Sequence, residues 1–114
     1  MMTALDFNKD IVVKPRHRLD INAAELLRKN LAHIETNGHK TLVIDMTDVE
    51  FIDSAGLGAL VTGLKTAYQQ GCRLLIYNLQ PSVRIVFEIT GLDRAFEIVN
   101  SLDGPLSQKV KLAA

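Results

Sequence analysis

Hydrophobic and polar positions follow two different periods along the chain, which predicts strands that alternate with helices. Residues 41–46 and 73–77 contain nearly uninterrupted apolar runs, LVI and LLI, which are typical of strands buried on both faces. Residues 11–14 and 96–99 predict two further short strands. Residues 3–10 form a weak edge in which residues 8–10 suit a turn, so a hairpin is expected at the start of the chain.

Pro15 interrupts this first apolar region. A proline cannot donate to a sheet ladder, so its position predicts an edge or a bulge near the end of the strand. Residues 16–19 can continue the strand beyond it.

The first helix is predicted between residues 22 and 38. Asn22 is the expected N-cap, Glu25 occupies the capping-box position, and Gly38 is the expected stop. The apolar positions recur at helical spacing, with Leu26 widening the stripe; they are residues 23, 27, 31 and 34.

Two more helices are predicted downstream. One starts at Ser54 and ends at residues 70–71, and its apolar face is expected to hold residues 57, 60, 61, 64 and 68. Gly58 and Gly63 lower its helix propensity, so their presence indicates that this helix packs closely on a sheet or on a partner. The other starts near Pro81 and ends at Gly91.

The order of these elements predicts an α/β fold. Helices that alternate with strands connect parallel strands, so we expect a mostly parallel sheet of 4–5 strands with helices packed on it. The 114 residues suit a single domain, 1–114, with a core at about 5–100 and a weakly determined tail at 101–114.

Polar residues follow the predicted strands and should gather at one edge of the sheet. Asp20, Asp45, the Asp53-Ser54 pair and Asn78 all lie where a strand ends. Ser54 would lie at or next to a helix N-cap, where the N–H groups and the helix dipole tolerate a phosphate. A phosphate there would add about 1.5–2 negative charges to an already acidic edge, as a binding switch requires.

A purely structural explanation of the same residues exists. Asp and Ser are common N-caps, and Ala55-Gly56 could be small residues at a crowded junction between strand and helix. Asp45 could likewise be a loop hydrogen-bonding residue. Spacing alone favours this explanation over a modification site.

Known catalytic motifs fit the chain poorly. The sequence from Gly58 to Thr66 resembles a P-loop, but Leu64 separates the second glycine from the lysine. Ile52 stands where a serine hydrolase elbow needs glycine. The three histidines lack metal-ligand spacing. We therefore expect no enzyme, no metal and no cofactor.

Composition narrows the class of partner. The formal net charge is zero, with 13 basic and 13 acidic residues, so nucleic acid is not an expected partner. No apolar run approaches the roughly 20 residues that span a bilayer, which predicts no membrane insertion. The single cysteine suits a reducing compartment, and we expect a cytoplasmic protein.

The stretch VIDMTDVEFIDSAGLGAL at residues 43–60 strongly resembles the signature of STAS domains, in particular of bacterial anti-sigma factor antagonists. Residues 18–20 (RLD), 70–74 (QGCRL) and 88–92 (EITGL) support it. The resemblance covers about residues 11–100. It implies an α/β fold with a mostly parallel sheet.

The resemblance also implies a mechanism, partner switching. The unphosphorylated protein binds an anti-sigma factor that is itself a serine kinase, and the sigma factor is freed. The kinase then phosphorylates the serine that matches Ser54, and a metal-dependent serine phosphatase reverses the modification. ATP would belong to the kinase. The supporting and partner-binding residues would be Asp20, Asp45, Asp53, Ala55, Gly56 and Leu57.

One departure from the family pattern concerns His17, which stands where the family usually has glycine. Glycine permits a backbone geometry that histidine adopts only with strain. An alternative function is a STAS scaffold subunit of a membrane lipid-transport or other transporter complex. The Asp-Ser pair favours the switch, and neighbouring genes would discriminate between the two.

Overall fold

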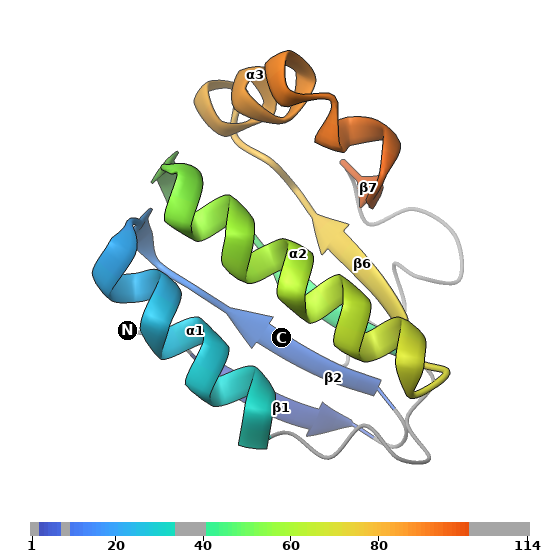
Figure 1. Ribbon diagram of the computed structural model, residues 1–114. Helices are drawn as coiled ribbons and strands as arrows, with labels where there is room; N and C mark the ends of the chain where they lie inside the picture. Colours follow the sequence, from blue (N-terminus) through green and yellow to red (C-terminus); the bar gives the residue numbers. More distant parts are fainter. Residues whose placement is uncertain (1–2, 8–9, 34–40, 101–114) are drawn as a thin grey trace.

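The computed structural model describes residues 3–7, 10–33 and 41–100, and its main sheet has five strands in the order β1-β2-β4-β6-β7 (Figure 1). β1 (Thr3–Phe7) pairs antiparallel with β2 (Asp10–Lys14), which confirms the expected hairpin. The other strands, β4 (Thr41–Asp45), β6 (Arg73–Tyr77) and β7 (Glu97–Val99), continue the sheet from β2 in parallel. The predicted α/β fold with a mostly parallel sheet is confirmed.

Three helices connect the parallel strands: α1 (Ile21–His33), α2 (Ser54–Gln69) and α3 (Pro81–Thr90). Figure 1 shows α1 and α2 side by side in front of the sheet. A short 3-10 helix, η1 (Leu92–Arg94), follows α3. Pro81 is in the first turn of α3, and Gly91 ends it with φ 77°, both as predicted.

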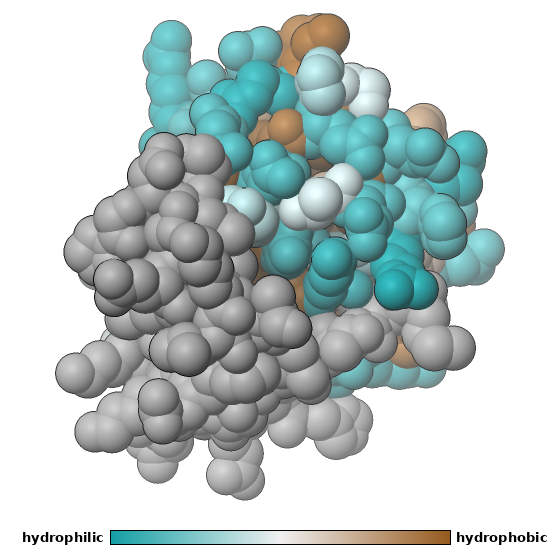
Figure 2. All heavy atoms as spheres, turned by 180° about the vertical axis from the view of Figure 1, so that it is seen from behind, coloured by the Kyte–Doolittle hydropathy of each residue, from teal (hydrophilic) through white to brown (hydrophobic). Residues whose placement is uncertain are grey.

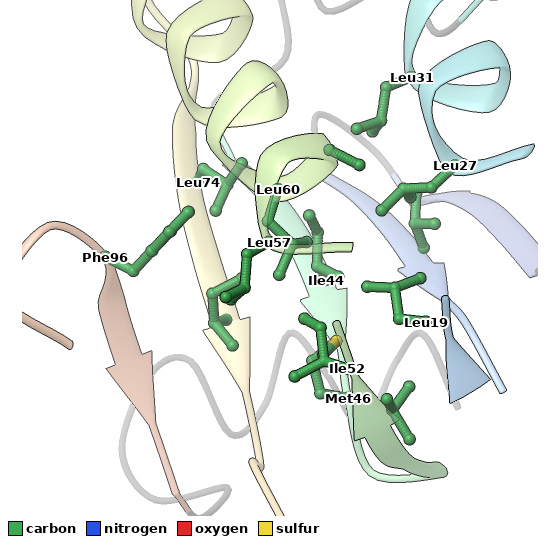
Figure 3. Packing of buried hydrophobic residues seen from close by; sticks show 14 of the residues in the cluster. Leu19, Leu27, Leu31, Ile44, Met46, Ile52, Leu57, Leu60, Leu74 and Phe96 are labelled. Carbon is green, nitrogen blue, oxygen red and sulfur yellow. The ribbon is translucent and has the colours of Figure 1, made fainter. Parts of the chain in front are cut away.

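The hydrophobic core lies between the sheet and these helices. All five residues of β4 are buried, because the strand lies at the centre of the sheet with a strand on each side. Leu42 and Ile44 belong to the cluster that includes the helices, whereas Val43 belongs to a second cluster formed by strand residues. Figure 3 shows the first cluster, in which Leu27 of α1 and Leu60 of α2 pack near Ile44.

The opposite side of the molecule is shown in Figure 2. Its described part is mainly hydrophilic there, with small hydrophobic areas at the upper end and between the hydrophilic side chains below it. α3 exposes two large apolar side chains, Ile85 at 52% and Ile89 at 80%.

A second, two-stranded sheet was not predicted. β3 (His17–Leu19) pairs in parallel with β5 (Val49–Ile52), a segment for which no strand was predicted. The register shifts between His17 and Arg18, so one strand carries an extra residue. Glu50 and Phe51 are therefore both exposed, and the strict alternation that identifies a strand is missing.

The expectation for Pro15 needs correction. β2 is an interior strand between β1 and β4, and Pro15 follows its last residue. The proline therefore does not mark an edge. It lies where the chain leaves the main sheet, and residues 17–19 form β3 in the other sheet rather than extending β2.

The start of α1 also differs from the prediction. The Oδ1 atom of Asp20, not the side chain of Asn22, accepts a hydrogen bond from the backbone N–H of Ala23, at 3.1 Å. The helix therefore starts two residues earlier, directly after β3. The predicted helix end at residues 34–38 lies outside the described residues, as do the turn residues 8–9 and the tail at 101–114.

Small residues carry more of the helix packing than predicted. Leu26 is 44% exposed and Tyr68 84%, so neither belongs to the buried stripe. α2 instead buries Gly56, Leu57, Ala59, Leu60, Gly63 and Ala67. A Cβ atom on Gly63 would lie 2.8 Å from Cδ1 of Leu31. Close packing at Gly63 is thus present, but its closest contact is with helix α1 rather than with a sheet or a partner.

Candidate functional site

Ser54 is the first residue of α2 and is exposed. The N-cap is the preceding residue, Asp53, whose backbone is extended (φ −111°, ψ −174°). Its Oδ1 atom accepts a hydrogen bond from the Gly56 N–H at 2.9 Å, and its carbonyl oxygen accepts one from Leu57 N–H at 3.0 Å. Because Asp53 caps the helix, the Ser54 hydroxyl is not needed as the cap.

The first turn of α2 lies directly on β3. The backbone N–H of Asp53 donates to the carbonyl oxygen of Leu19 at 3.3 Å. A Cβ atom on Gly56 would lie 2.2 Å from that same oxygen and 2.8 Å from Cγ1 of Ile52. Only glycine fits this contact without a shift of the backbone. It fixes the position of Ser54 relative to Asp20, the residue after Leu19.

The remaining motif residues pack the start of α2 into the core. Leu57 is 9% exposed and belongs to the main core cluster, and Ala55 packs against that cluster. Leu19, Ile52 and Leu57, one from each of β3, β5 and α2, lie together in this cluster (Figure 3). These contacts hold the first turn of α2 against the core.

Asp20 has two interactions next to this turn. Its Oδ1 atom caps α1, and its Oδ2 atom lies 3.8 Å from Nε of Arg18. The guanidinium carbon of Arg18 also lies 4.2 Å from the ring centroid of Phe51. Sequence reasoning missed the Arg18–Phe51 contact because it depends on the pairing of β3 with β5.

Asp45 belongs to a different group of polar residues. It is only 8% exposed, and its Oδ1 atom accepts hydrogen bonds from the backbone N–H, at 3.0 Å, and the hydroxyl of Thr47. The side chains of Asn78 and Gln80 donate to the hydroxyl oxygen and the carbonyl oxygen of Thr47, at 3.1 and 2.8 Å. Asp45 therefore shapes the turn between β4 and β5.

Two groups of hydrogen bonds organise the polar residues at the strand ends. In the first, the Asp53 N–H donates to the Leu19 carbonyl oxygen, which joins the segments that lead to Ser54 and to Asp20. In the second, Thr47 joins Asp45 to Asn78. Thr47, which joins the second group, was not predicted. A threonine two residues after an aspartate is typical of an Asx turn, so the sequence did contain a signal for it.

His17 adopts the backbone geometry that favours glycine. Its φ is 63°, in the left-handed region, and its N–H donates to the carbonyl oxygen of Asp48 at 2.7 Å. The left-handed conformation costs a non-glycine residue about 1–2 kcal/mol. The fold therefore keeps the glycine-type conformation at this position although the residue is histidine.

We expect His17→Gly to raise the free energy of unfolding by about 0.5–1 kcal/mol. The relief of the left-handed strain exceeds the added backbone entropy of glycine in the unfolded chain, which is about 0.4–1 kcal/mol. Chemical denaturation measures the change. Arg16→Gly is the matched control, because Arg16 is exposed and has no positive φ, so this variant should lose stability. Equal losses in both variants would contradict the assigned strain.

Other kinds of site find no support in the described residues. No group of three or more His, Cys, Asp or Glu residues among them could hold a metal ion. Within the same residues, every helix is too short or too polar to cross a membrane.

An α/β fold with an exposed serine after a capping aspartate, at the start of the helix that follows β5, defines the class of this protein. The STAS domain model matches residues 3–104, and the chain belongs to the STAS domain family.

The most informative relatives narrow this class to anti-sigma factor antagonists. The chain is 34% identical over 95 residues to the anti-sigma-B factor antagonist of Bacillus subtilis (strain 168), which covers 83% of this chain and 86% of the relative. A crystal structure of an anti-sigma factor antagonist from Mycobacterium paratuberculosis is 25% identical, with a TM-score of 0.79 over 90% of this chain and 87% of that one. Within the STAS proteins, the chain therefore belongs with the anti-sigma factor antagonists.

The fold is also that of SpoIIAA of Bacillus, an anti-sigma factor antagonist solved in two states. Its unphosphorylated form has a TM-score of 0.71 at 17% identity, covering 99% of this chain and 97% of that one. Its phosphorylated form has a TM-score of 0.70 at 18% identity, covering 100% of both chains. At these identities the likeness concerns the fold.

Proposed function

We propose that this protein is a regulatory binding protein switched by phosphorylation at Ser54. In the unphosphorylated state it binds an anti-sigma factor that is also a serine kinase, and this binding frees the sigma factor. Phosphorylation of Ser54 by the kinase dissociates the complex, and a metal-dependent serine phosphatase restores it. The protein itself catalyses nothing, and ATP is bound by the kinase. It acts in the cytoplasm, where sigma factors work.

The observation that carries this proposal is that Asp53 caps α2 while Ser54, the next residue, is exposed. Asp53 satisfies the N-terminus of α2, which leaves an exposed serine at the first helical residue. The helix dipole makes a phosphate at this position tolerable for the fold. The same phosphate adds about 1.5–2 negative charges beside Asp53 and Asp20. Modification would therefore change the surface strongly while the fold is kept.

The remaining residues of the predicted site support this switch in different ways. Asp20 is partly exposed, and its side chain would face the partner next to Ser54. Ile21 is 67% and Phe51 39% exposed, which adds apolar area to the same surface. Asp45 contributes by holding the turn between β4 and β5, since its carboxylate is buried.

We expect the purified anti-sigma factor kinase with ATP to add one phosphoryl group, on Ser54. Mass spectrometry of the intact protein and of its peptides measures the number and the place. Ser54→Ala should remain unmodified, whereas Ser82→Ala, at an exposed serine in the first turn of α3, should be modified like the wild type. Modification of Ser54→Ala to the same extent would overturn the assignment of this residue.

A further inference from the structure

Arg18 has an exposed guanidinium group that two weak interactions hold in place. Its Nε atom lies 3.8 Å from Oδ2 of Asp20, and its guanidinium carbon lies 4.2 Å above the Phe51 ring. The Arg18 side chain is 60% exposed, so solvent screens the ion pair with Asp20. An exposed cation–π contact is also weak, at about 0.5–1 kcal/mol. The guanidinium can therefore leave this position at low cost.

Arg18 lies on the strand that runs beside the start of α2. Asp20 lies beyond Leu19 in the direction in which β3 runs, and β5 runs parallel to β3 into Asp53 and Ser54. The hydrogen bond from Asp53 N–H to the Leu19 carbonyl oxygen holds the two strand ends side by side. The Arg18 guanidinium group contacts Asp20, which follows the end of β3, and Phe51, which lies three residues before Ser54. These two contacts place the guanidinium group next to both segments that meet at the start of α2.

We propose that Arg18 binds the phosphoryl group of phosphorylated Ser54 and leaves Asp20 and Phe51 to do so. This inference rests on the proposed modification of Ser54. A phosphoserine offers about 1.5–2 negative charges and three acceptor oxygens, and guanidinium binds phosphate through two parallel hydrogen bonds. Asp20 offers one carboxylate, whose Oδ1 atom already accepts the hydrogen bond from Ala23. The phosphate is therefore the stronger partner for Arg18.

This exchange would give the modification a second effect on the binding surface. When Arg18 moves to the phosphate, the cation leaves the Phe51 ring, which is 39% exposed. The partner would then meet a changed charge at Ser54 and a changed environment at Phe51. Arg18 is thus a positioning residue that couples the state of Ser54 to β5.

The charged groups around the phosphate set the second pKa of the phosphoserine. The carboxylates of Asp20, Asp53 and Glu50 disfavour the dianion, whereas the N-terminus of α2 and the Arg18 guanidinium favour it. Removal of the Arg18 charge should therefore raise the second pKa of the phosphoserine. A charge removed from Arg16, on the other side of His17, should have a smaller effect.

The test uses full-length protein with phosphoserine inserted at position 54 during translation, so that no kinase is needed. Phosphorus NMR across a pH titration measures the second pKa of the phosphate. We expect Arg18→Gln to raise this pKa by about half a pH unit or more, and Arg16→Gln to raise it by less than half of that amount. Arg18→Lys keeps the positive charge, so its pKa should stay close to the wild-type value. In addition, phosphorylation should shift the Phe51 ring resonances in the wild type but not in Arg18→Gln.

Equal pKa values in the Arg18→Gln and Arg16→Gln proteins would overturn the contact. So would a Phe51 response that is the same with and without Arg18. Thermal unfolding of the unphosphorylated variants checks that they fold. If Arg18→Gln does not fold, the phosphate pKa of Arg18→Lys is compared with that of the wild type instead. If the phosphoserine protein keeps full affinity for the anti-sigma factor while its pKa depends on Arg18, the proposed switch is wrong and the contact stands.

Discussion

Replacing Ser54 with Asp lowers the affinity for the anti-sigma factor by about 30- to 100-fold, the largest effect we expect on binding. The substitution places a permanent negative charge at the centre of the proposed interface. Burying a charge without a partner costs several kcal/mol of binding free energy. Because Ser54 is exposed and water can remain nearby, we expect a loss of about 2–3 kcal/mol. Isothermal titration calorimetry with the purified anti-sigma factor measures the change.

The fold should tolerate this substitution. Position 54 lies in the first turn of α2, where a carboxylate interacts favourably with the helix dipole by about 0.3–1 kcal/mol. Ser54→Asp should therefore unfold at the same temperature as the wild type or slightly above it. A weaker complex could then not be ascribed to an unfolded protein.

Two variants control for charge and for loss of the hydroxyl. Ser82→Asp makes the same change at an exposed serine in the first turn of another helix and should leave the affinity within twofold of the wild type. Ser54→Ala removes the hydroxyl without adding charge and should bind as tightly as the wild type. Unchanged affinity in Ser54→Asp would show that charge at this residue is not the switch.

The central part of the site could be predicted because its signals are local in the sequence. One continuous stretch of sequence contains β4, the serine and the helix that begins at it. The apolar run of β4 predicts correctly that this strand is buried. The family resemblance, rather than local pattern, pointed to position 17, where the family usually has glycine, and His17 keeps the glycine-type conformation with a φ of 63°. Local pattern therefore sufficed wherever neighbours in sequence were also neighbours in space.

The errors arose where long-range pairing overrides local pattern. β5 was missed because the bulge opposite His17 and Arg18 exposes two consecutive residues. Asn22 was preferred as the cap of α1 because it heads a capping box, whereas β3 ends so close to α1 that Asp20 takes the role. For Asp45, spacing alone favoured a loop hydrogen-bonding residue, and its carboxylate does accept hydrogen bonds from Thr47 in the turn after β4.

Together these elements show how the second sheet places the site. Without the second sheet, the first turn of α2 would have no backbone to pack against on the side that β3 occupies. The pair of β3 and β5 supplies the Leu19 backbone, on which the first turn of α2 rests. β3 also carries Arg18 and is followed by Asp20, and β5 carries Phe51, whose ring contacts the Arg18 guanidinium group. The two-stranded sheet, which was not predicted from the sequence, therefore provides much of the proposed binding surface.

Replacing Gly56 with Ala destabilises the protein by about 1–2 kcal/mol, the largest effect we expect on stability. The new Cβ atom would lie 2.2 Å from the Leu19 carbonyl oxygen, and this oxygen belongs to the backbone and cannot rotate away. Overpacking of a core contact costs about 1–3 kcal/mol and occasionally more, and the gain of about 1 kcal/mol in helix propensity offsets part of it. Chemical denaturation measures the free energy of unfolding.

Gly58→Ala is the matched control, two residues later in the same helix. Its Cβ atom would meet only the Nη2 atom of Arg28, at 3.3 Å, and this is the far end of a flexible side chain. The variant should therefore be as stable as the wild type or gain up to about 1 kcal/mol from helix propensity. Equal stability of the two variants would mean that α2 does not rest on the Leu19 backbone as closely as the structure has it.

Gly56→Ala should also weaken binding to the anti-sigma factor, although Ser54 itself is unchanged. The first turn of α2 can accept the new methyl group only by moving away from β3, and Ser54 and Asp53 would move with it away from Asp20. Affinity measured well below the unfolding transition separates this displacement from loss of folded protein. Full affinity in a destabilised but folded Gly56→Ala protein would show that the partner does not read Ser54 and the end of β3 as one surface.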